Sequence, residues 1–196
     1  MGHSREDKAL SHERILSAAS RKIRENGLDS LGVAELMKAV NLTHGGFYGH
    51  FASRDEMIVA GLERALLDGE AASTAGSRGK AARTVKSILN GYLSTAHRDN
   101  PGTGCAIASV AGEAARAAPP VREVMAARLD RYLAAMAAAA GDEEGAEDFA
   151  AAAWSTMIGA LLLSRIFAGS PKSDRILAAA RNSVLAAEQA LKDKAG

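Results

Sequence analysis

The chain has 196 residues, 47% of them hydrophobic, which is enough to bury a sizeable core in one domain or in two closely packed ones. Its net charge of +1 excludes bulk electrostatics as a reason to bind nucleic acid or a membrane. One cysteine cannot form a disulfide framework, and no apolar run approaches the roughly 18 residues of a membrane span or resembles a secretory signal, so we expect a cytoplasmic protein.

The distribution of residue types predicts an all-α fold. All four prolines lie outside the periodic apolar segments, alanine is abundant, and the β-branched and aromatic clusters that strands need are missing. Helical spacing of apolar residues predicts about nine helices. In chain order they cover residues 11–26, 33–40, 43–50, a segment beginning at 53, 81–97, 105–117, 120–140, 146–168 and 173–192. Turn-forming residues predict loops at residues 75–79, 98–104 and 141–145.

The segment "VNLTHGGFYGHF", residues 40–51, is unusual for a helix. Three glycines fall within five positions: Gly45, Gly46 and Gly49. Each costs about 1 kcal/mol relative to alanine in a helix interior, so the segment taken alone favours a loop. Nevertheless, Leu42, Phe47 and Phe51 keep helical spacing through the glycines.

The residues around this segment favour a helix-turn-helix over about residues 32–51. Asn41 tolerates the left-handed conformation that ends a helix, and Thr43 is a suitable N-cap for the next one. A capping box, Ser53 with Glu56, then begins the fourth helix. In such a motif the second helix enters the DNA major groove by its N-terminal end, and glycine permits a close approach to phosphates and base edges.

Residues 27–58, "GLDSLGVAELMKAVNLTHGGFYGHFASRDEMI", closely resemble the signature of the tetracycline-repressor (TetR) family of bacterial regulators, in a branch with an HGGFY recognition helix. Residues 102–116, "GTGCAIASVAGEAAR", are similar to a segment of one branch of that family. The resemblance implies a three-helix DNA-binding domain over residues 1–52. It also implies a helical regulatory domain over residues 53–196, with a ligand pocket and a dimer interface.

The resemblance also implies which residues contact DNA: Thr43, His44, Gly45, Gly46, Tyr48, His50 and Arg54. Thr43 would cap the recognition helix and reach a phosphate, and His44 would stand at its base-facing end. Tyr48, His50 and Arg54 match phosphate-contacting positions of the family. Gly32 departs from the family pattern, which has threonine or serine there to cap the second helix and touch a phosphate.

For the regulatory domain we expect a small-molecule effector among the middle helices and a homodimer interface on residues 146–168 and 173–192. The pocket candidates are the methionine and aromatic residues of these helices, with one cysteine: Tyr92, Cys105, Met125, Tyr132, Met136, Phe149, Trp154, Met157 and Phe167. Taken singly, each of these side chains more often fills a protein core than contacts a ligand. The expected function is a repressor that binds a palindromic double-stranded operator and is released by its ligand, which the sequence does not identify.

Three further hypotheses stay open: an all-helical ligand carrier whose helix-turn-helix is incidental, an electrophile sensor that acts through Cys105, and a helical enzyme with Cys105 as its nucleophile. Cys105 is expected at a helix N-terminus, where the helix dipole lowers a thiol pKa. The sequence contains no phosphate-binding loop, no zinc-ligand spacing and no nucleophile elbow, so we expect neither an enzyme nor a cofactor or metal.

Overall fold

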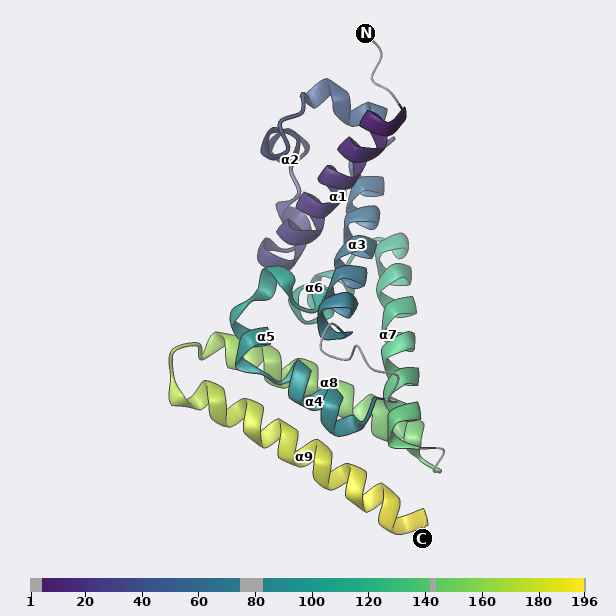
Figure 1. Cartoon of the computed structure of the whole chain (residues 1–196), viewed down its shortest axis with the longest axis vertical. Coiled ribbons are helices and arrows are strands. Elements are labelled where there is room, and N and C mark those ends of the chain that lie inside the picture. Colours follow the sequence, from purple (N-terminus) through teal and green to yellow (C-terminus); the bar gives the residue numbers. More distant parts are fainter. Residues whose placement is uncertain (1–4, 75–82, 142–143, 196) are drawn as a thin grey trace. The chain divides into compact units, whose positions relative to one another are not determined.

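The computed structural model describes residues 5–74, 83–141 and 144–195 (Figure 1). Within these ranges the chain forms nine α-helices and three short 3-10 helices and no strand, which confirms the all-α prediction. In chain order they are α1 (Arg5–Asn26), η1 (Leu28–Ser30), α2 (Val33–Ala39), η2 (His44–Gly49), α3 (Arg54–Thr74), α4 (Val85–Tyr92), α5 (Thr95–Asp99), η3 (Pro101–Thr103), α6 (Ala106–Ala114), α7 (Pro119–Ala140), α8 (Ala146–Ile166) and α9 (Pro171–Ala195). The predicted loop at 75–79 lies outside the described residues.

The chain divides into two compact units, each made of two stretches of sequence. The first unit comprises Met1–Ala71 and Gly102–Met125, and the second comprises Ala72–Pro101 and Ala126–Gly196. The long helices α3 and α7 contribute residues to both units. These units are defined by packing alone, so the functional division expected at residue 52 stays a prediction.

In the first unit, α1 packs closely against α3. Ile15, Ala19 and Ile23 repeat at helical spacing on α1 and are completely buried. Opposite them lies Gly61 of α3, where an added Cβ would come within 3.1 Å of the Ala19 Cβ. Glycine at this position therefore sets how closely the two helices approach.

A buried arginine joins three segments of the first unit. The Nε of Arg24 in α1 donates to the carbonyl oxygen of Gly102 at 2.7 Å, and its Nη1 donates to the Ala65 carbonyl of α3 at 3.1 Å. The same Nη1 donates to Ser20 Oγ at 2.8 Å and lies 3.4 Å from an Asp68 carboxylate oxygen. These partners compensate the cost of burying a charge.

The second unit is built around α8 and α9, which lie side by side (Figure 1). Ser173 Oγ of α9 donates to the Ser164 carbonyl of α8 at 2.7 Å. Arg98 of α5 donates to an Asp174 carboxylate oxygen at 2.6 Å, and Arg181 of α9 donates to the Leu93 carbonyl at 2.7 Å. These bonds attach the short α4–α5 segment to the helix pair.

The prediction of a single helix over residues 81–97 is wrong, because the described part of this segment forms two helices. Helix α4 ends at Tyr92, and α5 begins at Thr95. Ser94 has an extended backbone, and its hydroxyl accepts a hydrogen bond from His97 N at 3.1 Å. Serine caps a new helix well, which favours a break over continuation of the first helix.

The prediction of an α-helix over residues 43–50 is also wrong in type. Residues His44–Gly49 form a 3-10 helix, with Gly46 N donating to the Thr43 carbonyl at 3.0 Å and His50 N donating to the Phe47 carbonyl at 2.8 Å. Half of its residues are glycine, whose low helix propensity favours a short, tighter turn. The number of α-helices agrees with the expectation only because this loss offsets the split at residue 94.

Helix α8 is an exception to the expectation that no apolar segment is long enough to span a membrane. By length and composition alone, its 21 residues are apolar enough to cross a bilayer. However, 44% of its most apolar window is buried inside the protein. A core helix of a soluble protein satisfies the same criterion, so α8 is weak support for a membrane span.

Candidate DNA-binding surface

A tight turn joins α2 to η2, as the sequence predicts. Asn41 adopts the left-handed conformation, with φ of 58°, and Leu42 N donates to the Met37 carbonyl at 2.9 Å. This bond closes the C-terminus of α2 and reverses the chain within a few residues. The two helical segments and the turn therefore have the helix-turn-helix arrangement.

Thr43 caps η2 in the predicted manner. Its backbone is extended, and its Oγ1 accepts a hydrogen bond from Gly46 N at 3.3 Å. The side chain is exposed, and its hydroxyl hydrogen remains available to an outside acceptor such as a phosphate oxygen.

Two phenylalanines hold η2 against the first unit. Phe47 and Phe51 are buried, and their rings stack with centroids 5.6 Å apart. The Phe51 ring also stacks on His12 of α1, at 4.9 Å. Burial of these two aromatic side chains fixes the orientation of the whole segment.

The opposite side of η2 carries exposed aromatic groups. Tyr48 is 68% exposed, and its ring meets the exposed His44 edge-on at a centroid distance of 6.4 Å. Tyrosine and histidine can both donate hydrogen bonds to phosphate oxygens. The structure thus brings Thr43, His44 and Tyr48 together on one outward surface.

The glycines of η2 are not required by the packing of the protein itself. A Cβ added at Gly45 or Gly49 would meet no atom within 4 Å, and one added at Gly46 would make only ordinary contacts of 3.5 Å and longer. None of the three has a positive φ. Gly45 and Gly49 are exposed and leave the backbone uncovered on the outer side of the segment.

His50 lies on the inner edge of the surface. It is half-buried, and its Nδ1 is buried without a hydrogen-bond partner. Burial lowers the pKa of His50, and the neighbouring His12 and Lys8 lower it further. The neutral imidazole is therefore favoured, so any contact with phosphate would be a neutral hydrogen bond and not an ion pair.

Arg54 is fixed by the backbone just before the beginning of α2. Its Nε donates to the Leu31 carbonyl oxygen at 2.9 Å, while the side chain stays exposed. The start of α3 is closed by Glu56, whose N–H donates to Ser53 Oγ at 3.1 Å. The Glu56 carboxylate accepts from Ala52 N at 2.6 Å, one residue before the partner that a standard capping box would use.

Gly32 caps α2 without a side chain, as its departure from the family pattern implies. It is exposed and extended, with φ of −81° and ψ of 127°, and a Cβ there would be 4.0 Å from its nearest neighbour, Glu35. The backbone would therefore accept a threonine or serine without strain.

The aromatic residues predicted to line a ligand pocket pack on one another in the second unit. Trp154 stacks on Tyr132 at 4.9 Å, meets Tyr92 edge-on at 5.0 Å, and donates from Nε1 to the Tyr132 carbonyl at 2.8 Å. Met136 and Met157 are completely buried. These contacts are those of a packed core, so the ligand-binding role of this cluster stays a prediction.

The other candidates lie elsewhere. Phe149 is buried in α8, whereas Phe167 is exposed at the end of that helix. Cys105 and Met125 are buried in the first unit, and Cys105 is the N-cap residue of α6. Among the described residues, no group of histidine, cysteine, aspartate or glutamate side chains is placed to hold a metal ion.

A patch of large apolar side chains is exposed near the end of α8. It comprises Leu162, Leu163, Ile166 and Phe167. Ile166 is the most exposed of them, at 73%. Exposed aliphatic side chains that cluster on one helix end are typical of a surface that another protein covers.

Sequence reasoning missed one contact that supports the DNA-binding segment. A carboxylate oxygen of Glu113 in α6 accepts a hydrogen bond from Leu28 N at 2.7 Å, at the start of η1. The two residues are 85 positions apart, so no local pattern indicates their pairing.

Comparisons with known proteins agree with this geometry. Residues 15–60 match the family model described as bacterial regulatory proteins, tetR family, whereas no curated protein matches the chain. Similar solved structures include a TetR transcriptional regulator from Chloroflexus aurantiacus, with a TM-score of 0.76, 21% identity, and 91% of this chain and 94% of that chain covered. A TetR family regulator from Cytophaga hutchinsonii has a TM-score of 0.76 and 18% identity, with 95% and 98% covered. The reduced form of NemR from E. coli has a TM-score of 0.70 and 21% identity, with 88% and 95% covered.

At these identities the structural similarity establishes the fold, and the family model identifies the N-terminal segment. The chain therefore has a TetR-like fold, and its residues 15–60, which contain the helix-turn-helix, match the tetR family of bacterial regulatory proteins.

Proposed function

We propose that the protein is a bacterial, cytoplasmic transcriptional repressor that binds a palindromic operator as a homodimer and is released by a small-molecule ligand. The observation that carries this proposal is the outer surface of η2. It combines exposed donors on Thr43, His44 and Tyr48 with glycines that no internal contact requires.

Backbone that no side chain covers allows a partner such as DNA to approach it closely. In a major groove, the N-terminal end of η2 would bring backbone N–H groups toward phosphates, and His44 toward base edges. A side chain at Gly45 would meet open space in the free protein but would collide with DNA in this pose. The HGGFY sequence, residues 44–48, would then be characteristic of a branch of the family in which the backbone of the recognition helix lies close to the DNA.

The exposed apolar patch on α8 supports a homodimer. Covering Ile166 and its neighbours would remove large aliphatic groups from water. A single short recognition segment rarely binds one sequence tightly, whereas two copies one helical turn apart, about 34 Å, would recognise a palindrome.

Release by a ligand requires that the ligand bind one conformation of the protein more tightly than another. Helix α3 begins five residues after η2 ends and is the direct mechanical continuation of the recognition segment. A shift of α3 would move η2 with it as a rigid body.

A thiol switch at Cys105 is the second candidate. Its thiol lies at the N-cap of α6, but the side chain is only 5% exposed, which restricts the access of reagents. We therefore propose a reversible small-molecule effector in preference to an electrophile. A Cys105→Ser variant that loses a response to electrophiles, with operator affinity unchanged, would reverse this preference.

The decisive experiment is selection of duplexes from a random pool by the full-length protein, followed by analytical ultracentrifugation of the complex. We expect an enriched palindrome bound by two protomers. Enrichment of no sequence would exclude a specific regulator and favour a helical ligand carrier.

A further inference from the structure

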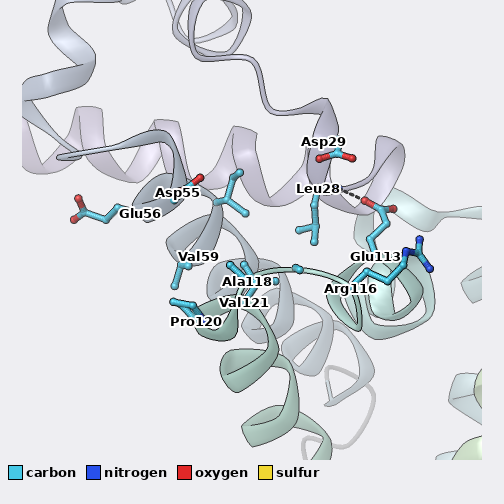
Figure 2. Close-up of a pocket in the computed structure, with 12 residues that line it drawn as sticks. Leu28, Asp29, Asp55, Glu56, Val59, Glu113, Arg116, Ala118, Pro120 and Val121 are labelled. Atoms are coloured by element: carbon cyan, nitrogen blue, oxygen red, sulfur yellow. Dashed lines mark hydrogen bonds between the residues drawn. The ribbon is translucent and has the colours of Figure 1, made fainter.

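A cavity of about 510 Å³ opens in the first unit, bounded by η1, the first turns of α3, and the link between α6 and α7 (Figure 2). Its volume lies within the roughly 300–1,000 Å³ typical of small-molecule sites. None of the residues that the sequence suggested as ligand contacts lines it. The mechanism proposed above does not use it.

The inner wall of this cavity is apolar. Leu28 of η1, Ile58 of α3 and Val121 of α7 line it and are almost completely buried within the protein. Val59 and Pro120 also line the cavity, and Figure 2 shows them on the side of Val121. A hydrocarbon or aromatic group placed against this wall would be removed from water.

The polar part of the lining is strongly acidic. It contains one guanidinium group and four carboxylates: Arg116, Asp29, Asp55, Glu56 and Glu113. Glu113 and Glu56 already accept hydrogen bonds from the backbone, at Leu28 N and Ala52 N respectively. The remaining two acidic side chains, Asp29 and Asp55, are exposed at the edge of the cavity.

We propose that this cavity binds a small amphipathic cation, with its apolar body on the wall of Leu28, Ile58 and Val121 and its protonated amine near Asp29 and Asp55. The excess of carboxylates attracts a cation and repels an anion of the same shape. The apolar wall adds affinity that an inorganic cation would not gain. As the site of an effector, the cavity rests on the proposed function, but binding itself requires no DNA.

Three compounds with one apolar body and different head groups test the charge preference: 4-phenylbutylamine, 4-phenylbutanol and 4-phenylbutanoate. Isothermal titration calorimetry on the full-length protein, without DNA, should rank them amine, alcohol, carboxylate. We expect the amine to bind about tenfold more tightly than the carboxylate at low ionic strength, with the difference shrinking as salt is added. Equal affinities, or no saturable binding of the amine up to about 1 mM, would overturn the proposal.

Variants test the location. Asp29→Asn combined with Asp55→Asn should weaken amine binding about fivefold and leave the alcohol unchanged, because exposed charges contribute modestly. The matched control is Glu63→Gln with Glu123→Gln, two exposed side chains on α3 and α7 outside the cavity, which should change neither.

A filled cavity should bind none of the three compounds. Val59→Phe projects a ring into the space from α3, and Ala118→Leu partly fills it from the α6–α7 link. Thermal melts establish that each variant is folded before titration. Undiminished amine binding by a folded Val59→Phe or Ala118→Leu variant would place the ligand elsewhere.

A separate duplex-binding measurement distinguishes this inference from the proposed function. A protein that binds the amine but selects no duplex would contradict the regulator proposal and leave the cavity assignment intact. A protein that selects a palindrome but binds no amine would contradict the cavity assignment alone.

Discussion

The Glu113 carboxylate and the Leu28 backbone N–H are joined by a hydrogen bond of 2.7 Å, which ties α6 to the turn that follows α1. The neighbouring Gly27 is adapted to this contact. It has a φ of +87°, and a Cβ added to it would lie 2.6 Å from a Glu113 oxygen. A side chain at residue 27 would therefore be strained and would also displace the carboxylate.

Gly27→Ala should lower the free energy of unfolding by about 1–2 kcal/mol, because the positive φ and extended ψ of residue 27 are accessible to glycine and strongly disfavoured for alanine. The matched control is Gly112→Ala in α6, where an added Cβ meets nothing within 4 Å and should stabilise by up to about 1 kcal/mol. Chemical denaturation measures both values. If both substitutions changed the free energy of unfolding equally, the Glu113 side chain would have moved away from residue 27 at no energetic cost.

The local features of the DNA-binding segment could be predicted from sequence because each depends on residues a few positions apart. The left-handed Asn41, the Thr43 cap and the Ser53 hydroxyl bond to Glu56 N all appear as expected. The residues at helix ends have strong preferences, so the sequence pattern alone predicts the local backbone geometry.

Long-range features could not be predicted in this way. The pairing of Glu113 with Leu28 depends on how α6 packs against α1, and the cavity beside it depends on the same packing. Residue type also does not distinguish rings that surround a ligand from rings that pack together, as Tyr92, Tyr132 and Trp154 do. The break at Ser94 was missed because the apolar spacing continues on both sides of it.

Gly45→Leu should leave the protein folded and at least as stable, since its Cβ would occupy open space and leucine favours helical structure. Operator binding should weaken by more than about tenfold through collision with DNA. Thermal melts and gel shifts on one preparation separate the two effects. Gly112→Leu, another open position, is the control that should bind DNA normally.

Tyr48→Phe and Arg54→Ala should weaken binding to all duplexes, because both remove a group expected to bind phosphate rather than a base. For Arg54→Ala the magnitude of the slope of log K against log salt should fall by about 0.9 for each phosphate that the protein no longer neutralises. Tyr48→Phe removes an uncharged hydrogen-bond donor and should leave this slope unchanged. Arg54→Ala also removes the hydrogen bond to Leu31, so its unfolding must be measured in parallel. An unaltered slope in Arg54→Ala would show that the guanidinium only supports α2.

Stability should decline in mildly acidic solution. Burial is the main cause that lowers the pKa of His50 and His97 below the ordinary 6.5, and neighbouring positive charges lower both further. The unfolded chain therefore binds more protons than the folded one between the folded pKa values and 6.5. The stability contributed by the neutral rings is complete above 6.5 and is lost as the pH falls below it.

Melting temperatures measured from neutral pH downward should show this loss, and His50→Gln combined with His97→Gln should reduce it. The pKa of Asp68 is lowered from 3.8, so the pH dependence of stability that comes from Asp68 falls at more acidic pH. It does not overlap with the pH range of the two histidines. A double variant with the same pH dependence as the original protein would contradict the assignment to these two histidines.

Gly32→Thr should raise both stability and operator affinity, because it restores a side chain that the resemblance to the family implies at this position. The extended backbone and the 4.0 Å clearance at Gly32 accept a β-carbon, so a threonine hydroxyl can cap α2 and reach a phosphate. We expect a gain of a few tenths of a kcal/mol in stability, since glycine is already a tolerable cap. Operator affinity should rise about fivefold from a new charge-assisted hydrogen bond.

Gly32→Ala is the control, because it fits the same space without a hydroxyl and should bind DNA no better than the original protein. Equal affinities of the two variants in gel shifts would mean that residue 32 does not face a phosphate, and that the surface formed by η2 is oriented differently on DNA.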